Sequence, residues 1–295
     1  MSALLHRVLK ISPREVEFER RGFDCSHPGI RGRLENIGQV FLRGYHSALQ
    51  EADQNVLAQD LDRIDLEHRG FAYEGAAMAM ALLDGIGLRR NTFPRFAAGA
   101  GKQHIFMLHV GAGWAYARLP WLRKRIERVI RKLHPVLRWL VIDGYGFHEG
   151  YFRFRSRVRS GHSTSMLSHL SIEARRVFYQ GLGRSLWFVN GADVQKISAS
   201  IAGFPLLYHS DAWSGVGLAC AYAGGMEQNA ITELHCQAGI HAPALAQGVA
   251  FAAKTRLFAG NPAKHTEAAE QRQVSAAIGI RGHRLRSSWQ FLLAR

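Results

Sequence analysis

The spacing of apolar residues along the chain predicts helices. Between residues 118 and 138, leucine and isoleucine recur every three or four positions, which places them on one face of a helix. These apolar positions are Leu119, Leu122, Ile126, Ile130, Leu133 and Leu137. Residues 55–64 show the same spacing, and residues 192–204 and 265–278 show weaker versions. In "YFRFRSRVRSG", by contrast, arginine alternates with other residues, so we expect a small β excursion near residues 151–160.

Glycines reveal a longer period in the chain. Seven segments align on one glycine each, and successive glycines lie 31 to 39 residues apart. The aligned glycines are Gly44, Gly75, Gly111, Gly150, Gly181, Gly215 and Gly248. A period of about 34 residues is typical of stacked helical hairpins. We therefore predict one all-α domain over residues 1–295, solenoid or toroid-like, with an N-terminal arm (1–35), a repeat body (36–265) and a C-terminal helix or tail (266–295).

The alignment also groups residues that could form a site. Equivalent positions of stacked repeats face the same surface, so the residues one and two places before each glycine should converge. The candidate catalytic and metal-binding residues are Glu74, His109, His148 and Glu149. The candidate substrate-binding residues are Tyr73, Tyr179, Arg184 and Trp213. Two imidazoles and two carboxylates suit a transition metal such as iron, and they equally suit acid–base catalysis.

Structural roles for the same residues remain open. Histidine and glutamate often cap helices or belong to buried hydrogen-bond networks, and neither the E-x-x-H nor the HExxH motif occurs in this chain. Arg184 either holds a ligand carboxylate or pairs with an acidic side chain. His209 and Asp211 either extend the site or begin a helix.

Composition and charge define the class of protein. With 47% hydrophobic and 21% charged residues, the chain can bury a substantial core, and its formal charge of +15 favours an anionic partner. The predicted basic helix at 118–138 carries eight Lys/Arg, and it is either a docking surface for an acidic protein or a solvated face. No nucleic-acid-binding motif accompanies it. The three cysteines lack C-x-x-C spacing, and we find neither a secretory signal nor a membrane-spanning run, so we expect a soluble, cytoplasmic protein.

Eight ordered blocks resemble one bacterial family. They are "ISPREVEFERRGF", "LENIGQVFLRGYHSAL", "RGFAYEGAAMAMALLDG", "HVGAGWAYARLP", "DGYGFHEGYF", "GLGRSLWF", "WSGVGLACAYAGG" and "LAQGVAFAAKTR". Together they are similar to the DUF1702 family, over roughly Leu9 to Gly260. That family is best known from gene clusters that build enediyne polyketides.

The resemblance implies a role in specialised-metabolite biosynthesis beside a polyketide synthase that makes a conjugated polyene. We therefore expect an enzyme that acts on a hydrophobic, polyketide-derived small molecule, through acid–base or metal-assisted redox chemistry. The alternative is a non-catalytic helical scaffold that holds an acidic carrier protein or a biosynthetic complex.

Overall fold

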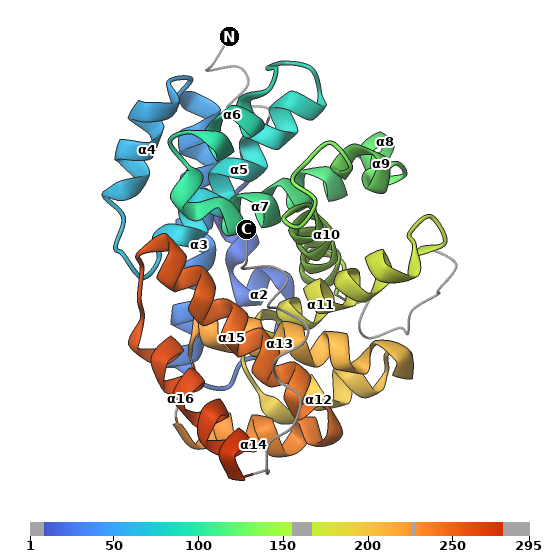
Figure 1. Cartoon of the computed structure of the whole chain (residues 1–295). Helices are drawn as coiled ribbons and strands as arrows, with labels where there is room; N and C mark the ends of the chain where they lie inside the picture. The colour runs from blue at the N-terminus through green and yellow to red at the C-terminus, as the bar shows by residue number, and fades with distance from the viewer. Residues whose placement is uncertain (1–8, 155–166, 226–227, 280–295) are drawn as a thin grey trace.

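The computed structural model describes residues 9–154, 167–225 and 228–279, and every regular element in these ranges is a helix (Figure 1). The all-α prediction is therefore confirmed. The expected β excursion near 151–160 is wrong at its start, because Tyr151 and Phe152 end a helix. Its remainder from residue 155 lies outside the described residues.

Seven long helices form the body of the protein. They are α3 (Pro28–Gln50), α5 (Arg69–Gly85), α7 (Ile105–Arg118), α10 (Arg138–Phe152), α11 (Ile172–Val189), α13 (His209–Ala223) and α15 (Ala242–Ala259). Each packs extensively against the next in this order. Their sequences are apolar around much of the circumference: in α5, every residue from Gly70 to Leu83 is buried. Helices of this kind belong inside a larger assembly of helices.

Eight further helices precede, connect or follow these seven in the described part of the chain, and α4, α6, α8, α9, α12 and α14 lie toward the outside (Figure 1). They are α2 (Phe18–Arg21), α4 (Gln54–Asp62), α6 (Thr92–Ala98), α8 (Pro120–Arg123), α9 (Ile126–Ile130), α12 (Val194–Ala202), α14 (Gln228–Ala238) and α16 (Lys264–Gly279). Side-chain caps fix where several helices begin. Asp53 accepts from two backbone N–H groups of α4, Ser171 accepts from the Ala174 N–H of α11, and Asp193 accepts from the Lys196 N–H of α12.

The long basic helix expected at 118–138 is broken into pieces. The α7 helix ends at Arg118, and Leu119 before Pro120 has an extended backbone, as residues before proline prefer. A turn at Arg125 then separates α8 from α9. The predicted apolar face is nevertheless real, because Ile126 and Ile130 are buried.

Glycines set how closely the long helices approach one another. A Cβ atom added at Gly75 would lie 1.9 Å from the carbonyl oxygen of Phe41 on α3, far closer than two such atoms can come. An added Cβ would also lie within about 2 Å of a carbonyl oxygen of the preceding long helix at four further glycines of the seven aligned ones. These are Gly111, facing Glu74 O; Gly181, facing Asp143 O; Gly215, facing Gln180 O; and Gly248, facing Ser214 O. Backbone touches backbone at each of these crossings.

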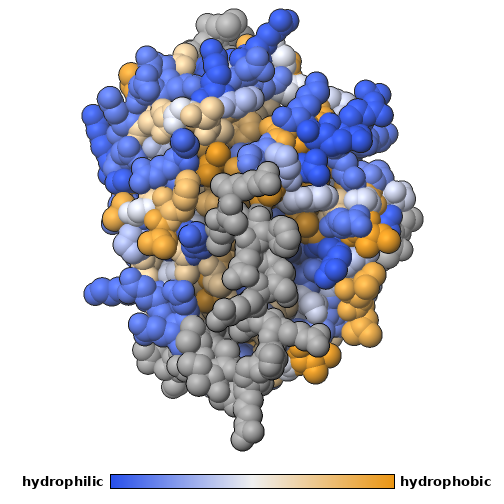
Figure 2. Space-filling view, in the orientation of Figure 1, coloured by the Kyte–Doolittle hydropathy of each residue, from blue (hydrophilic) through white to orange (hydrophobic). Residues whose placement is uncertain are grey.

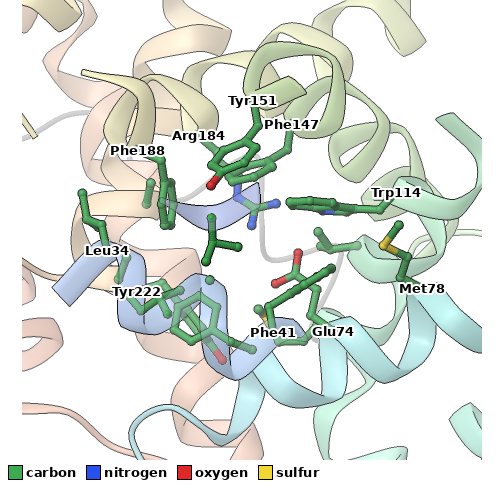
Figure 3. Close-up of a pocket in the computed structure, with 18 of the residues that line it drawn as sticks. Leu34, Phe41, Glu74, Met78, Trp114, Phe147, Tyr151, Arg184, Phe188 and Tyr222 are labelled. Atoms are coloured by element: carbon green, nitrogen blue, oxygen red, sulfur yellow. The ribbon is translucent and has the colours of Figure 1, made fainter. Parts of the chain in front are cut away.

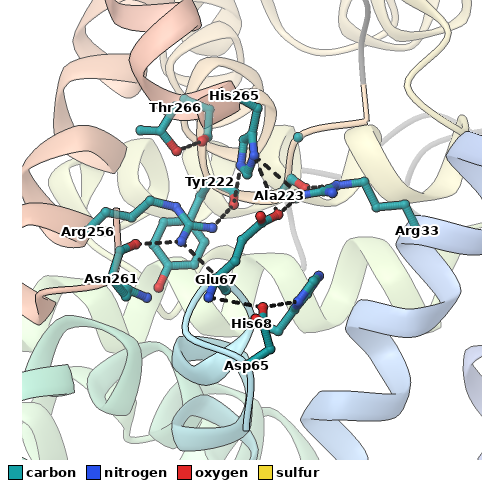
Figure 4. A network of polar contacts seen from close by, with 12 residues as sticks. Arg33, Asp65, Glu67, His68, Tyr222, Ala223, Arg256, Asn261, His265 and Thr266 are labelled. Carbon is teal, nitrogen blue, oxygen red and sulfur yellow. Dashed lines mark hydrogen bonds and ion pairs between the residues drawn. The ribbon is translucent and has the colours of Figure 1, made fainter. Parts of the chain in front are cut away.

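A polar network joins the first helices to the last ones (Figure 4). The buried Arg256 of α15 donates to the carbonyl oxygens of Glu67, Tyr222 and Asn261. Arg33 of α3 donates to the Ala223 carbonyl at the end of α13 and pairs with Glu67. Several of these carbonyls belong to helix C-termini, where a cation is favourable. Hydrogen bonds thus connect α3 and the start of α5 to α13 and α15.

Candidate functional site

One cavity lies among the seven long helices, and each of them contributes to its wall. The centre of a water-sized sphere can reach about 70 Å³ of this space, which is partly open to solvent. Its wall is mainly apolar and contains many aromatic rings (Figure 3). The aromatic lining residues are Phe41, Phe71, Phe106, Trp114, Phe147, Tyr151, Phe152, Phe188, Tyr222 and Phe251.

The rings form a continuous surface along one side of the cavity. Trp114 lies with its ring centroid 4.6 Å from that of Phe41 and 4.9 Å from that of Phe147, and Phe147 lies 5.4 Å from Phe188. Four successive rings from α3, α7, α10 and α11 thus contact one another. Such a wall suits a long apolar ligand with a flat conjugated system.

Two charged residues at the centre face this apolar space. Glu74 of α5 and Arg184 of α11 both point into the cavity (Figure 3). Arg184 forms a buried ion pair with Asp143 of α10 through Nη1 and Oδ1, and its guanidinium carbon lies 5.1 Å from the Phe147 ring centroid. The second carboxylate oxygen of Asp143 accepts from Gln180 Nε2 at 3.3 Å. Only one carboxylate oxygen of Asp143 therefore pairs with Arg184.

Burial changes the proton affinity of Glu74. Loss of water raises its pKa to about 7, and the charge of Asp143 acts in the same direction. Arg184 and the Trp114 indole lower the pKa, but they offset only part of the rise. Burial alone would lower the pKa of Arg184, but Asp143 and Glu74 outweigh it and keep the guanidinium charged. Glu74 can therefore exchange a proton near neutral pH.

The helix contacts correct the glycine alignment in α10. The carbonyl of the residue before each glycine faces the glycine of the next long helix: Glu74 faces Gly111, and Asp143 faces Gly181. Val110 O, just before Gly111, faces Gly144, where an added Cβ would lie 2.0 Å away. Gly144, not Gly150, is therefore the equivalent glycine of α10. An added Cβ at Gly150 would instead meet the hydroxyl of Ser185.

This correction changes which carboxylate corresponds to Glu74. Asp143 precedes Gly144 as Glu74 precedes Gly75, so Asp143 takes the equivalent position and Glu149 does not. The position three residues after the glycine lines the cavity in six helices. These residues are Met78, Trp114, Phe147, Arg184, Leu218 and Phe251.

His148 and Glu149 lie in the second half of α10 and are not part of the cavity lining. His148 Nδ1 is 3.8 Å from a carboxylate oxygen of Glu149, which also lies 3.6 Å from Arg153 Nε. Burial lowers the pKa of His148, although Glu149 acts in the opposite direction. The pair is a buried polar contact beside the rings of Trp114 and Phe152.

His109 also lies outside the cavity wall. Its Nδ1 is 2.8 Å from the Ile105 carbonyl oxygen one helical turn earlier, and its ring packs edge-on against Phe93 of α6. Burial lowers its pKa, which favours the neutral imidazole. Of the four candidate catalytic residues, only Glu74 lines the cavity.

The candidate aromatic residues pack against outer elements. Tyr73 stacks on His104 with centroids 4.1 Å apart and donates its hydroxyl to Asp62. Tyr179 stacks on Tyr208 at 4.2 Å. Trp213 is buried but does not line the cavity. Among the candidate substrate-binding residues, Arg184 alone faces the cavity.

The described residues do not form the expected metal site. Within residues 9–154, 167–225 and 228–279, no three His, Cys, Asp or Glu side chains come together as metal ligands. Asp211, considered as an extension of the site, pairs with the exposed Arg176. His209 is 2.9 Å from the Phe204 carbonyl oxygen through Nε2. Both belong to the start of α13.

Sequence reasoning missed Asp143 and most of the aromatic wall. A usable signal is present as pairs of glycines two residues apart in four of the long helices. They are Gly111 and Gly113, Gly144 and Gly146, Gly181 and Gly183, and Gly215 and Gly217. Alignment of the helices on these pairs selects Gly144 in α10. Asp143 then takes the position equivalent to that of Glu74.

Comparison with known proteins identifies the family. No curated protein and no solved structure matches the chain. Across the described residues, no helix has the length and apolarity needed to span a membrane. A family model described as "Protein of unknown function (DUF1702)" matches residues 1–279, which confirms the resemblance seen in the sequence. The chain belongs to the DUF1702 family.

Proposed function

We propose that this protein binds a hydrophobic, conjugated small molecule in the central cavity and acts on it by proton transfer. The observation that carries the proposal is an aromatic cavity among seven helices with one Glu–Arg pair at its centre. Apolar rings would bind a polyene by burial. The resemblance to proteins of enediyne clusters suggests a polyketide-derived polyene as the ligand.

Glu74 would carry the chemistry. In its protonated form, which its raised pKa maintains up to about pH 7, it can donate a proton to the bound molecule. The carboxylate that remains faces the positive charge of Arg184, and it can take a proton back from another atom of the ligand. The protein is then an acid–base catalyst that returns to its starting state.

Binding of a neutral polyene tests this proposal. We expect parinaric acid methyl ester, a conjugated fluorescent polyene, to bind with a rise in its fluorescence because the cavity excludes water. Ala219 lines the cavity, so Ala219→Phe should fill part of it and weaken binding at least about tenfold. Ala202→Phe, on the exposed side of α12, is the control and should bind normally. Equal affinity of both variants would place the ester elsewhere and contradict the proposal.

A second candidate function is a scaffold for an acidic carrier protein. The chain from Arg118 at the end of α7 to the start of α10 carries six exposed Lys/Arg side chains, and hydrophilic residues gather over α8 and α9 (Figure 2). The exposed cations are Arg118, Lys124, Arg125, Arg128, Arg131 and Lys132. No carboxylate among the described residues forms an ion pair with these six. They are therefore available to an anionic surface.

Charge reversal separates this scaffold from a solvated face. We expect the triple change Arg125→Glu, Arg128→Glu and Lys132→Glu to abolish salt-sensitive binding of an acidic carrier protein, with little effect on unfolding, because all three side chains are exposed. Binding is measured at low and high salt. The control variant replaces three other exposed arginines, Arg14, Arg63 and Arg153, with glutamate. Equal loss in both triple variants would indicate a general charge effect.

A further inference from the structure

We infer that the ligand of the cavity carries a carboxylate, held by Arg184, at one end of its apolar chain. This inference rests on the proposed function, since it concerns the same cavity. It specifies a fatty-acid-like ligand in place of a purely hydrocarbon one.

The hydrogen bonds of Arg184 leave some of its N–H donors unused. Its Nη1 donates to Asp143, and among the described residues no other acceptor for its guanidinium is found. Asp143 accepts from only one nitrogen of the guanidinium, and its other oxygen accepts from Gln180. Arg184 therefore keeps unused N–H donors in an apolar cavity. A carboxylate matches such donors in shape and charge.

The surrounding charges decide which ligand charge fits. The charged groups that act on Glu74 are Arg184 and Asp143, and the Trp114 indole and the Tyr222 hydroxyl also lie in its electrostatic field. Glu15 lines the cavity as well, but it pairs with Arg21. When Glu74 is protonated, the charges of Arg184 and Asp143 cancel. A ligand carboxylate can then bind the guanidinium N–H groups of Arg184 that Asp143 does not use. When Glu74 is ionised, the cluster already has one excess negative charge. Anion binding should therefore accompany the protonated form of Glu74.

The position of Arg184 on α11 also supports a ligand with a carboxylate. Arg184 takes the place three residues after the glycine, where five other long helices present Met78, Trp114, Phe147, Leu218 and Phe251. An apolar side chain would be sufficient there if the ligand were only hydrocarbon. The guanidinium carbon also lies within cation–π distance of the Phe147 ring, which lines the cavity too. The polar end of the ligand would lie at α11 and its chain along the aromatic wall.

Comparison of parinaric acid with its methyl ester tests the inference. At pH 6 we expect the acid to bind at least about tenfold more tightly than the ester, because only the acid offers a charged acceptor. The double variant Asp143→Asn/Arg184→Gln removes both charges with little change of volume. It should lose this preference while it still binds the ester.

The pH dependence provides a second readout. As the pH rises through about 7, Glu74 ionises and repels the ligand carboxylate, so the affinity of wild-type protein for the acid should fall about tenfold between pH 6 and pH 8. Glu74→Gln imitates the protonated form and should bind the acid equally at both pH values. The ester should show no such dependence in either protein.

The outcomes separate the two proposals. Equal affinity for acid and ester, or a preference that survives in the double variant, overturns the carboxylate assignment and leaves the cavity as a polyene site. Acid binding that does not weaken above pH 7 also overturns it. If neither compound binds, the proposed function fails as well.

Discussion

Gly75→Val and Gly215→Val should each lower the free energy of unfolding by about 3 kcal/mol or more. A Cβ atom at either position would lie 1.9 Å from a backbone carbonyl oxygen, that of Phe41 or Gln180. No side-chain rotation relieves such a contact, because the obstacle is the backbone of the neighbouring helix. The two helices would have to separate, and the packing around the cavity would open. Urea unfolding measures the loss.

Gly32→Ala is the matched control for these variants. Gly32 also lies inside a long helix, α3, but a Cβ atom added there would meet nothing within 4 Å. We expect this change to stabilise the protein by about 0.5–1 kcal/mol, because alanine favours the helix. If Gly75→Val and Gly215→Val unfolded at the same urea concentration as wild type, the close helix contacts would be refuted.

Asp143→Ala should lower the free energy of unfolding by about 3–5 kcal/mol, because it leaves the buried Arg184 without its counter-ion. Asp143 is fully buried, so water cannot take over its role. The remaining carboxylate near the cation is Glu74, and we expect its pKa to fall as Arg184 draws it into the ionised form.

The double variant Asp143→Ala/Arg184→Met distinguishes charge from packing. With both charges removed, most of the lost stability should return, since a buried pair is often replaced by apolar residues at little net cost. Urea unfolding of the two single variants and the double variant measures the coupling. A double variant as unstable as Asp143→Ala would show that lost volume, and not the unpaired charge, caused the effect.

The sequence was sufficient to predict the helices and most of the glycines where they meet. The apolar spacing in residues 118–138 located the buried Ile126 and Ile130, because helical periodicity depends only on local geometry. It could not show that Pro120 and a turn at Arg125 divide the segment. The arrangement as stacked helical hairpins with a period of about 34 residues, solenoid or toroid-like, stays a prediction, as do the limits of the N-terminal arm and the C-terminal tail.

The candidate site was predicted in part. The sequence alone named Glu74, from its place before an aligned glycine, and Arg184, as a cation that either holds a ligand carboxylate or pairs with an acidic side chain. It placed Tyr73 beside Glu74 in the same site, but successive residues of a helix point about 100° apart. Tyr73 therefore faces His104 and Asp62, while Glu74 faces the cavity.

Only the tertiary structure decided which residues of different helices meet. The α10 helix contains three glycines, and although the paired spacing marks Gly144 and Gly146, only the contacts show which glycine meets which neighbouring helix. Contact of Val110 O with Gly144, and of Asp143 O with Gly181, fixes that choice. The choice brings Asp143 to Arg184 and leaves His148 and Glu149 outside the cavity wall. The physical reason is that backbone contact between helices depends on the space at each glycine, which the partner helix defines and the local sequence does not.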